Sequence, residues 1–250
     1  MRFPSFLLLC LAFFSMNQMA DNSFKEQQLT HERVQAAYVE KGTQMTALLK
    51  AHQLTNTQLQ LFFRAFKQEG ILELWGKKPQ AKSFTLLKTY PICAASGDLG
   101  PKREQGDYQV PEGVYFIEKF NPKSDFHLSV GINYPNASDK IRGTQGKLGG
   151  DIYIHGDCVT IGCLPMTDEN IKEIYILAVE ARNNGQIEIP VHIFPAKLTP
   201  ATMAALKKAY KSSPNLPLFW EELQPIYQAF ERSKKLPAVQ ISSTGRYSCR

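Results

Sequence analysis

Short apolar stretches separated by turn-forming residues dominate the middle of the chain. The stretch "LQLFFRAF", the triplet Gln68-Glu69-Gly70 and the stretch "ILELW" predict two strands joined by a tight turn. The same pattern predicts further strands at residues 84–93, 113–120, 127–132, 151–155 and 187–194. Short strands with connections rich in Gly and Pro indicate a mostly β domain, either a sandwich or a barrel.

One helix is expected inside this β region. Residues 171–181 place apolar side chains on one helical face, and Thr167 or Asp168 can cap the start of the helix. The run Asn183-Asn184-Gly185 is typical of a helix end. The predicted helix therefore interrupts the series of strands.

Helical periodicity also appears at both ends of the chain. Sparse apolar residues over 24–54 predict one or two amphipathic helices. Near the C-terminus, Thr199-Pro200 has the order of a cap followed by a first-turn proline, and residues 216–235 predict a helix with a kink or break near Pro225. We therefore predict a mostly β domain with helical N- and C-terminal extensions, α+β overall.

The first residues have the pattern of a secretory signal peptide. Arg2 precedes an apolar run over residues 6–14, and a polar segment follows, with a cleavage site expected after Ala20. Nine apolar residues are too few to span a bilayer, which needs about 20. We expect an exported protein with no membrane span after signal cleavage.

Length and charge refine this picture. With 250 residues, of which 43% are hydrophobic, the chain can form one large domain with extensions. We predict a signal peptide at 1–20, a helical extension at 21–57, a mostly β domain at 58–196 and a helical extension at 197–250. The net charge of +6 suits an anionic polymer. The basic residues are scattered and form no aromatic-interleaved patch, so we expect no nucleic-acid binding.

The stretch "IHGDCVTIGCLPM", residues 154–166, holds the most concentrated candidate chemistry. A zinc site would use His155, Cys158 and Cys163, but structural zinc needs four ligands, usually in paired close spacings that are absent here. The pattern of a zinc deaminase is also missing, because Asp157 stands where that pattern needs a glutamate. We therefore expect no metal and no cofactor.

The residues alone leave two interpretations of the cysteines open. After export the chain keeps four cysteines, whose three full pairings cannot be distinguished by sequence, and a Cys158–Cys163 disulfide is one possibility. Alternatively, Cys163 is a nucleophile with His155 as its base. Gly162 would let bare N–H groups approach a reacting carbonyl, and the following helix would favour a thiolate through its positive end.

Three motifs in order resemble the L,D-transpeptidase catalytic (YkuD) domain family, and more closely its YafK-type branch. They are "YPICAASGDLGPKREQGDYQVPEGVY", "IHGDCVTIGC" and "FWEELQPIYQAFERSKKLPAV". The family's His-Gly pair and Ser/Thr-x-Gly-Cys unit match His155-Gly156 and residues 160–163. The resemblance spans residues 59–239. The loop between the two units is shorter than usual in the family, and Ile161 stands where the family often has histidine.

The resemblance implies a fold, a substrate and residue roles. It implies that residues 58–196 are a catalytic domain, an L,D-transpeptidase-type β-sandwich with an inserted helix. This domain would act on peptidoglycan stem peptides in the periplasm or cell envelope. Cys163 would attack the carbonyl on the L-centre of diaminopimelate and form a thioester. His155 would transfer protons, the Gly156 carbonyl would orient it, and the N–H groups of Gly162 and Cys163 would form the oxyanion hole. Tyr153, Arg142 and Lys102 are candidate substrate-binding residues, and Cys93 with Cys158 is a candidate disulfide.

The acceptor of the acyl group stays open. Most members of the family transfer it to an amine, whereas YafK-type members are associated with hydrolysis of the bond between diaminopimelate and an anchored lipoprotein. A peptidoglycan-anchored lipoprotein is therefore a possible partner. A third alternative is a catalytically decayed module that only binds peptidoglycan.

Overall fold

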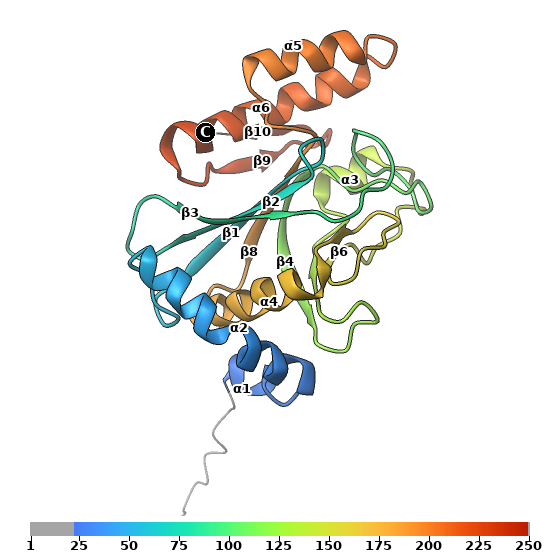
Figure 1. Ribbon diagram of the computed structural model, residues 1–250. Coiled ribbons are helices and arrows are strands. Elements are labelled where there is room, and N and C mark those ends of the chain that lie inside the picture. Colours follow the sequence, from blue (N-terminus) through green and yellow to red (C-terminus); the bar gives the residue numbers. More distant parts are fainter. Residues whose placement is uncertain (1–22, 250) are drawn as a thin grey trace, which may run out of the picture.

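A computed structural model describes residues 23–249, in which one eight-stranded mixed sheet forms the centre of the fold (Figure 1). The sheet order is β3-β2-β1-β8-β4-β5-β6-β7. The strands are β1 (Gln60–Phe66), β2 (Ile71–Lys77), β3 (Thr85–Pro91), β4 (Gly113–Asn121), β5 (Ser129–Ile132), β6 (Tyr153–His155), β7 (Leu164–Pro165) and β8 (Ile189–Phe194).

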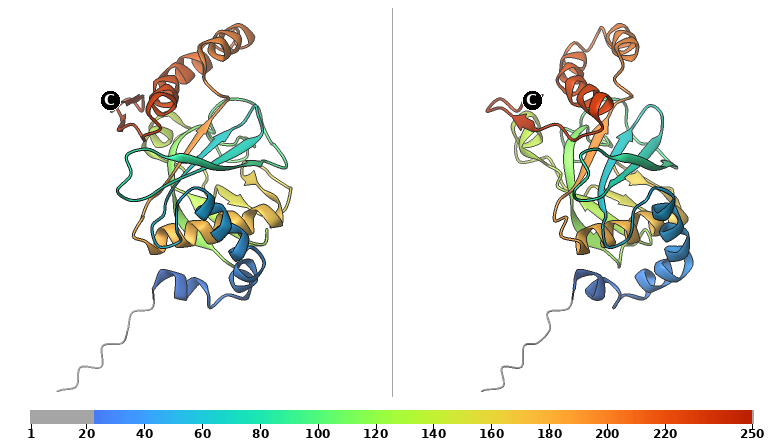
Figure 2. Two further views of the ribbon diagram at one scale, coloured as in Figure 1. Left: turned by 60° about the vertical axis from the view of Figure 1, so that its left-hand side comes forward. Right: turned by 90° about the vertical axis from the view of Figure 1, so that its left-hand side faces the viewer.

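Strand pairing brings distant segments together at the sheet centre. The predicted hairpin is present, with β1 antiparallel to β2 around Gly70, whose φ of 61° suits glycine. Strand β8, which comes late in the chain, lies parallel to β1 and antiparallel to β4. At the far edge β6 and β7 are parallel, and the sheet curls between its two edges (Figure 2).

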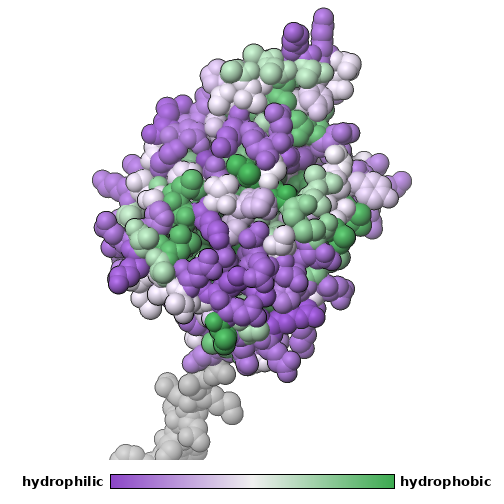
Figure 3. All heavy atoms as spheres, viewed as in Figure 1, coloured by the Kyte–Doolittle hydropathy of each residue, from purple (hydrophilic) through white to green (hydrophobic). Residues whose placement is uncertain are grey.

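Helices cover both faces of the sheet. On one face lie α1 (Phe24–Gln28), α2 (Glu32–Ala51) and α4 (Thr167–Asn183); on the other lie α5 (Pro200–Ala209) and α6 (Asn215–Ser233) (Figures 1 and 2). The short helix α3 (Ala137–Arg142) follows β5. Helix α2 packs on α4 through buried Val34, Ala37, Met45 and Leu49. Hydrophilic residues dominate the surface over these N-terminal helices (Figure 3).

The C-terminal helices form a second apolar cluster with the opposite face of the sheet. Phe66 and Phe194 from the sheet contact a cluster that includes Trp220 and Leu223 of α6. Helix α6 continues through Pro225 without ending. A small hairpin of β9 (Val239–Ile241) and β10 (Tyr247–Cys249) then packs on α6.

A buried carboxylate ties this second cluster to the segment before β4. Glu112 is fully buried, and it accepts hydrogen bonds from the Trp220 indole at 2.7 Å and from the Gly100 N–H at 2.6 Å. The Lys67 ammonium lies 3.0 Å from the same carboxylate. Because buried polar groups must be paired, this network fixes the segment that later forms one wall of the site.

The predicted fold class is confirmed, with one specification. The mostly β centre, the inserted helix α4 and the helical segments at both ends are present. The β centre has the form of a single curled sheet. The predicted signal peptide lies outside the described residues. Within residues 23–249, no helix combines the length and the apolar character needed to cross a membrane.

Candidate active site

His155 is the last residue of β6 and is held from several sides. It pairs with Ser129 of β5, and its carbonyl accepts a hydrogen bond from the Met166 N–H at 2.8 Å. Its side chain places Nδ1 2.5 Å from the Gly156 carbonyl oxygen. A carbonyl can only accept, so Nδ1 carries the proton and Nε2 is left as the basic nitrogen of the neutral ring.

Gly156 is a glycine because the space around it is filled. A β-carbon there would lie 2.6 Å from the Asp168 carboxylate and 2.7 Å from the Phe126 carbonyl oxygen. The next residue, Asp157, donates its N–H to the same Asp168 oxygen at 2.9 Å. The start of α4 and the loop before β5 therefore enclose the carbonyl that orients His155.

The His155 ring lies in an apolar setting. Only 1% of the His155 surface is exposed, and the centroid of the Phe126 ring lies 4.7 Å from the centroid of the imidazole. Burial lowers the pKa of His155, against partial opposition from the Gly156 hydrogen bond and the Asp157 carboxylate. The imidazole is therefore neutral near neutral pH, which is the form that a general base requires.

Cys163 lies directly before β7, the strand that pairs with β6 beside His155. The backbone N–H of Tyr153 points to its Sγ at 3.4 Å. Burial raises the pKa of the Cys163 thiol, and the Tyr153 N–H and the Lys102 ammonium only partly oppose this. The sequence led us to expect a thiolate favoured by the helix; the structure instead favours a neutral thiol at rest, which needs a base to become a nucleophile.

A cavity of about 330 Å³ opens beside Cys163. Its walls include Cys163 and Leu164, Lys67 and Val110, most of the segment between Ile92 and Leu99, and Tyr210 directly after α5. The cavity therefore joins the predicted nucleophile to the segment after β3 and to the C-terminal helices. No hydrogen bond joins His155 to Cys163 among the described residues.

Thr160 holds the backbone around Cys163, a role that the sequence analysis missed. Its hydroxyl accepts hydrogen bonds from the N–H groups of Gly162 at 3.1 Å and Cys163 at 2.8 Å, and donates to the Cys163 carbonyl at 2.9 Å. The two N–H groups predicted as an oxyanion hole are therefore occupied in this structure, and they are not free donors as we expected. The only sequence signal was the position of Thr160 in the Ser/Thr-x-Gly-Cys unit.

Gly162 is required at this turn for conformational reasons. Its φ of 134° is rarely adopted by other residues, and a β-carbon would lie 2.9 Å from the Gln109 carbonyl oxygen. Ile161 beside it is 74% exposed, so its side chain contributes nothing to the buried part of the site.

Cys93 and Cys158 form a disulfide, the pairing suggested by the resemblance. Their α-carbons are 5.5 Å apart, and the bond closes a sequence separation of 65 residues. Of the cysteines that the structure describes, Cys163 and Cys249 are free thiols. The bond ties the turn after His155 to the end of β3 and leaves Cys158 unable to pair with Cys163.

We expect non-reducing peptide mapping of the exported protein to recover a Cys93–Cys158 peptide and an unmodified Cys163. A Cys93→Ser/Cys158→Ser double variant should lose roughly 3–5 kcal/mol of unfolding free energy, because a long loop is no longer closed in the unfolded chain. Denaturant unfolding measures this loss. A mapped Cys158–Cys163 bond in active protein would contradict both the pairing and the assignment of Cys163 as nucleophile.

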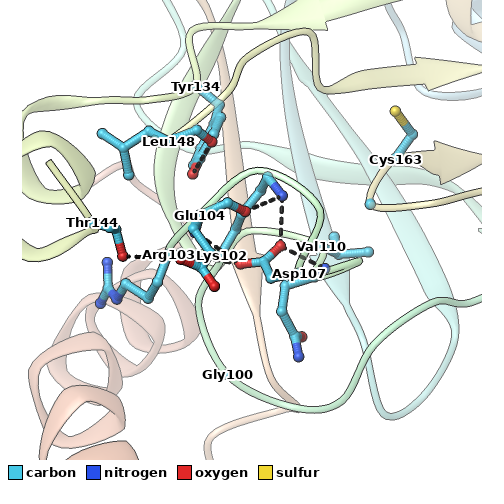
Figure 4. A network of polar contacts seen from close by, with 12 residues as sticks. Gly100, Lys102, Arg103, Glu104, Asp107, Val110, Tyr134, Thr144, Leu148 and Cys163 are labelled. Atoms are coloured by element: carbon cyan, nitrogen blue, oxygen red, sulfur yellow. Dashed lines mark hydrogen bonds and ion pairs between the residues drawn. The ribbon is translucent and has the colours of Figure 1, made fainter. Parts of the chain in front are cut away.

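The three predicted substrate-binding residues lie in different surroundings. Lys102 is buried and donates to the Asp107 carboxylate at 2.6 Å and to the Glu104 carbonyl at 2.9 Å (Figure 4). Arg142 pairs with Glu222 of α6 at 2.7 Å. These contacts do not support the prediction that Lys102 and Arg142 bind substrate carboxylates. Lys102 connects residues of its own loop, which lies to one side of Cys163 in Figure 4. Arg142 joins α3 to α6.

Tyr153 stays close to the nucleophile. Its hydroxyl contacts the Asp151 carboxylate at 3.3 Å, and burial, followed by the Asp151 charge, raises its pKa. The helix α4 begins at Thr167 after Met166, and the Thr167 hydroxyl accepts the Asn170 N–H at 3.4 Å, as expected of a capping residue; Asp168 accepts from the Asp157 N–H instead. Within residues 23–249, no group of three His, Cys, Asp or Glu side chains could hold a metal ion.

Comparison with known proteins gives a consistent result. The model of the L,D-transpeptidase catalytic domain (YkuD) matches residues 80–193. The Escherichia coli (strain K12) protein named "Putative L,D-transpeptidase YafK" is 40% identical over 189 residues, which cover 75% of this chain and 72% of that protein.

Two solved structures are also similar. The helical cell shape determining protein Pgp2 from Campylobacter jejuni is 18% identical, with a TM-score of 0.45, over 74% of this chain and 73% of that one. Bdellovibrio bacteriovorus Bd1075 is 22% identical, with a TM-score of 0.40, over 70% of this chain and 64% of that one. The family assignment rests on the sequence match, because both TM-scores are below 0.5.

Proposed function

The chain belongs to the L,D-transpeptidase catalytic domain family, and from that premise we propose that it is a cysteine-dependent acyltransferase of peptidoglycan. The proposed reaction forms a thioester between Cys163 and the carbonyl on the L-centre of diaminopimelate in a stem peptide. The observation that carries the proposal is that Cys163 is a free thiol on the wall of the 330 Å³ cavity, while the neighbouring Cys158 is held in a disulfide.

The first half-reaction follows from two neutral partners. His155 Nε2 takes the proton of the Cys163 thiol as Sγ attacks the carbonyl carbon, and the carbonyl oxygen becomes an oxyanion. His155 then donates that proton to the leaving amine, the carbon–nitrogen bond breaks, and the thioester remains. The absence of a resting contact between the two side chains does not oppose this step, because catalytic hydrogen bonds often tighten only with substrate bound.

The oxyanion needs the two N–H donors of Gly162 and Cys163, which bind the Thr160 hydroxyl in this structure. A negatively charged oxygen is a stronger acceptor than a neutral hydroxyl, so it can replace Thr160 on the N–H groups of Gly162 and Cys163. Such donors would then stabilise the tetrahedral intermediate more than the bound substrate, which is the condition for faster chemistry.

The second half-reaction returns the free enzyme. An amine or water attacks the thioester while His155 accepts its proton, and the thiolate of Cys163 leaves and is reprotonated. An amine acceptor gives a cross-link or an attached protein. Water gives an amidase that releases an anchored lipoprotein. The Cys93–Cys158 disulfide supports a location in an oxidising compartment, in keeping with export to the periplasm.

A two-part assay tests this function. Purified exported protein is incubated with a carbapenem and examined by intact mass, and then with peptidoglycan that carries covalently bound protein, whose products are identified by mass spectrometry. We expect a covalent adduct of one carbapenem, and either new cross-links or released protein. A folded wild-type protein that forms no adduct and leaves the polymer unchanged would instead be a decayed binding module.

A further inference from the structure

The N-terminal helix α2 contacts the loop that covers His155. Arg33, in the first turn of α2, donates from one guanidinium nitrogen to the carbonyls of Ser124 at 2.5 Å and His127 at 2.8 Å. A single side chain thus joins two points, three residues apart, in the loop between β4 and β5. The loop lies about 90 residues beyond Arg33 in the chain, so only the fold brings them together.

That loop is in direct contact with the His155–Gly156 pair. The Phe126 ring lies against the imidazole at 4.7 Å, and Leu128 accepts the Gly156 N–H at 3.1 Å. The Phe126 carbonyl also fills the space that a side chain on Gly156 would need. Any displacement of the loop therefore changes the surroundings of the imidazole and of the carbonyl that orients it.

The loop has a conformation that requires external support. His127 has a φ of 67°, which is uncommon for a residue with a side chain, and its buried Nε2 has no hydrogen-bond partner. Strained backbone of this kind persists when surrounding contacts hold it. Arg33 supplies such a contact, because it binds the carbonyl of the strained residue itself.

Helix α2 also contacts the start of α4, the second segment that lies against Gly156. Lys41 pairs with Glu169 at 2.5 Å, and Glu40 pairs with Lys172 at 2.6 Å. Glu169 belongs to the first turn of α4, next to Asp168, which holds the Asp157 N–H. The same helix therefore contacts both segments that enclose Gly156.

We propose that α2 is a positioning element for the active-site histidine. Arg33 acts through the loop carrying Phe126, which shields the His155 imidazole from water and keeps it oriented by the Gly156 carbonyl. Arg33 is a positioning residue, since it touches neither the substrate nor the reacting atoms. The inference rests on the proposed function of His155 as the general base.

The pH dependence of acylation separates positioning from simple stability. Burial lowers the pKa of His155, so admission of water beside a displaced Phe126 would raise that pKa toward its ordinary value. Only the neutral imidazole is a base, and the acidic limb of the rate profile would then move to higher pH. Titratable and charged residues occur on each segment packed against the ring: Asp157 in its own turn, Asp125 and His127 in the covering loop, Cys163 before β7, and Asp168 and Lys172 in α4. Of these, the Asp157 carboxylate acts on the pKa of His155.

The test uses the full chain and the rate constant for acylation of Cys163 by a carbapenem, measured across pH. Arg33→Met keeps the length of the side chain but removes its donors. We expect a rate about 10- to 100-fold lower, because small displacements of catalytic groups have effects of this size, with a larger loss at acidic than at alkaline pH. Arg33→Lys should restore most of the rate, since Lys67 already donates to two carbonyls in this protein.

The matched control is Lys50→Met in the last turn of α2, which should behave as the wild type. A normal rate and an unshifted profile for Arg33→Met would overturn the proposal. If Arg33→Met does not fold, Phe126→Leu tests the contact through which Arg33 is proposed to act, because it removes the ring from His155. A normal rate and an unshifted profile for Phe126→Leu would also overturn the proposal. Failure of the wild type to react would contradict the proposed function itself, which keeps the two outcomes distinct.

Discussion

Replacing Cys163 with alanine is expected to abolish both turnover of peptidoglycan and formation of a carbapenem adduct. The variant lacks the only proposed nucleophile, and no other side chain on the cavity wall is a thiol. The reactions that pass through a thioester therefore have no first step. Intact mass spectrometry should find only unmodified protein after incubation with the drug, and product analysis should match a reaction without enzyme.

Cys249→Ala is the matched control for this experiment. Cys249 is the second free cysteine of the described residues and, like Cys163, is partly buried, but it lies in β10 and does not line the cavity beside Cys163. Its variant should react as the wild type does. An adduct that persists in folded Cys163→Ala and disappears in Cys249→Ala would show that the nucleophile was wrongly assigned.

The loss in Cys163→Ala must also be separated from unfolding. The backbone around position 163 is held by Thr160 and by Gly162, and none of those hydrogen bonds uses the thiol. Removal of Sγ loses the Tyr153 N–H contact at 3.4 Å, the long hydrogen bond to the Asp151 carbonyl at 3.7 Å and some packing. We therefore expect a thermal midpoint close to that of the wild type, so that the lost activity reports on chemistry.

Local patterns predicted the elements whose formation depends on nearby residues. The hairpin around Gly70 and the start of α5 are examples, since Thr199 accepts from the Thr202 N–H and Pro200 occupies the first turn as expected. The family motif also directed attention to the segment between His155 and Cys163. In these cases the determining contacts lie within a few positions of one another.

Features that depend on distant contacts were not predictable in the same way. The hairpin of β9 and β10 has only three residues per strand, and it is held by contacts such as the Tyr247 hydroxyl with Asn136 at 2.7 Å. Pro225 does not end α6, because the helix buries a continuous apolar face that includes Leu223 and Ile226.

The partners of Lys102 and Arg142 could not be predicted from the sequence either. Lys102 and Arg142 lie in or beside loops, where exposed lysines and arginines are common, and nothing local identifies Asp107 or Glu222 as their partners. The role of Thr160 is short-range, but a threonine hydroxyl has several alternative local hydrogen bonds. Arg33 and Phe126 come together with His155 only through pairing of β5 with β6 and packing of α2 on α4.

His155→Gln is expected to fold and to lose about 100- to 10,000-fold in the rate of Cys163 acylation, the usual size of acid–base catalysis. A glutamine amide can still donate toward the Gly156 carbonyl, but it cannot accept the thiol proton. His52→Gln, at the end of α2, is the control and should keep the wild-type rate. The measurement is the carbapenem acylation rate of each variant at neutral pH.

The pH profile of the same variant tests the mechanism more sharply. In the wild type, the rate should rise as His155 loses its proton, at a pH below the ordinary value for histidine, because burial lowers its pKa. In His155→Gln this limb should disappear. The remaining rate should depend on spontaneous loss of the Cys163 proton, and it should still be rising above about pH 9, since burial raises the pKa of that thiol above its ordinary value. A His155→Gln profile that keeps the wild-type acidic limb, or a rate near that of the wild type at neutral pH, would mean that another group serves Cys163 as base.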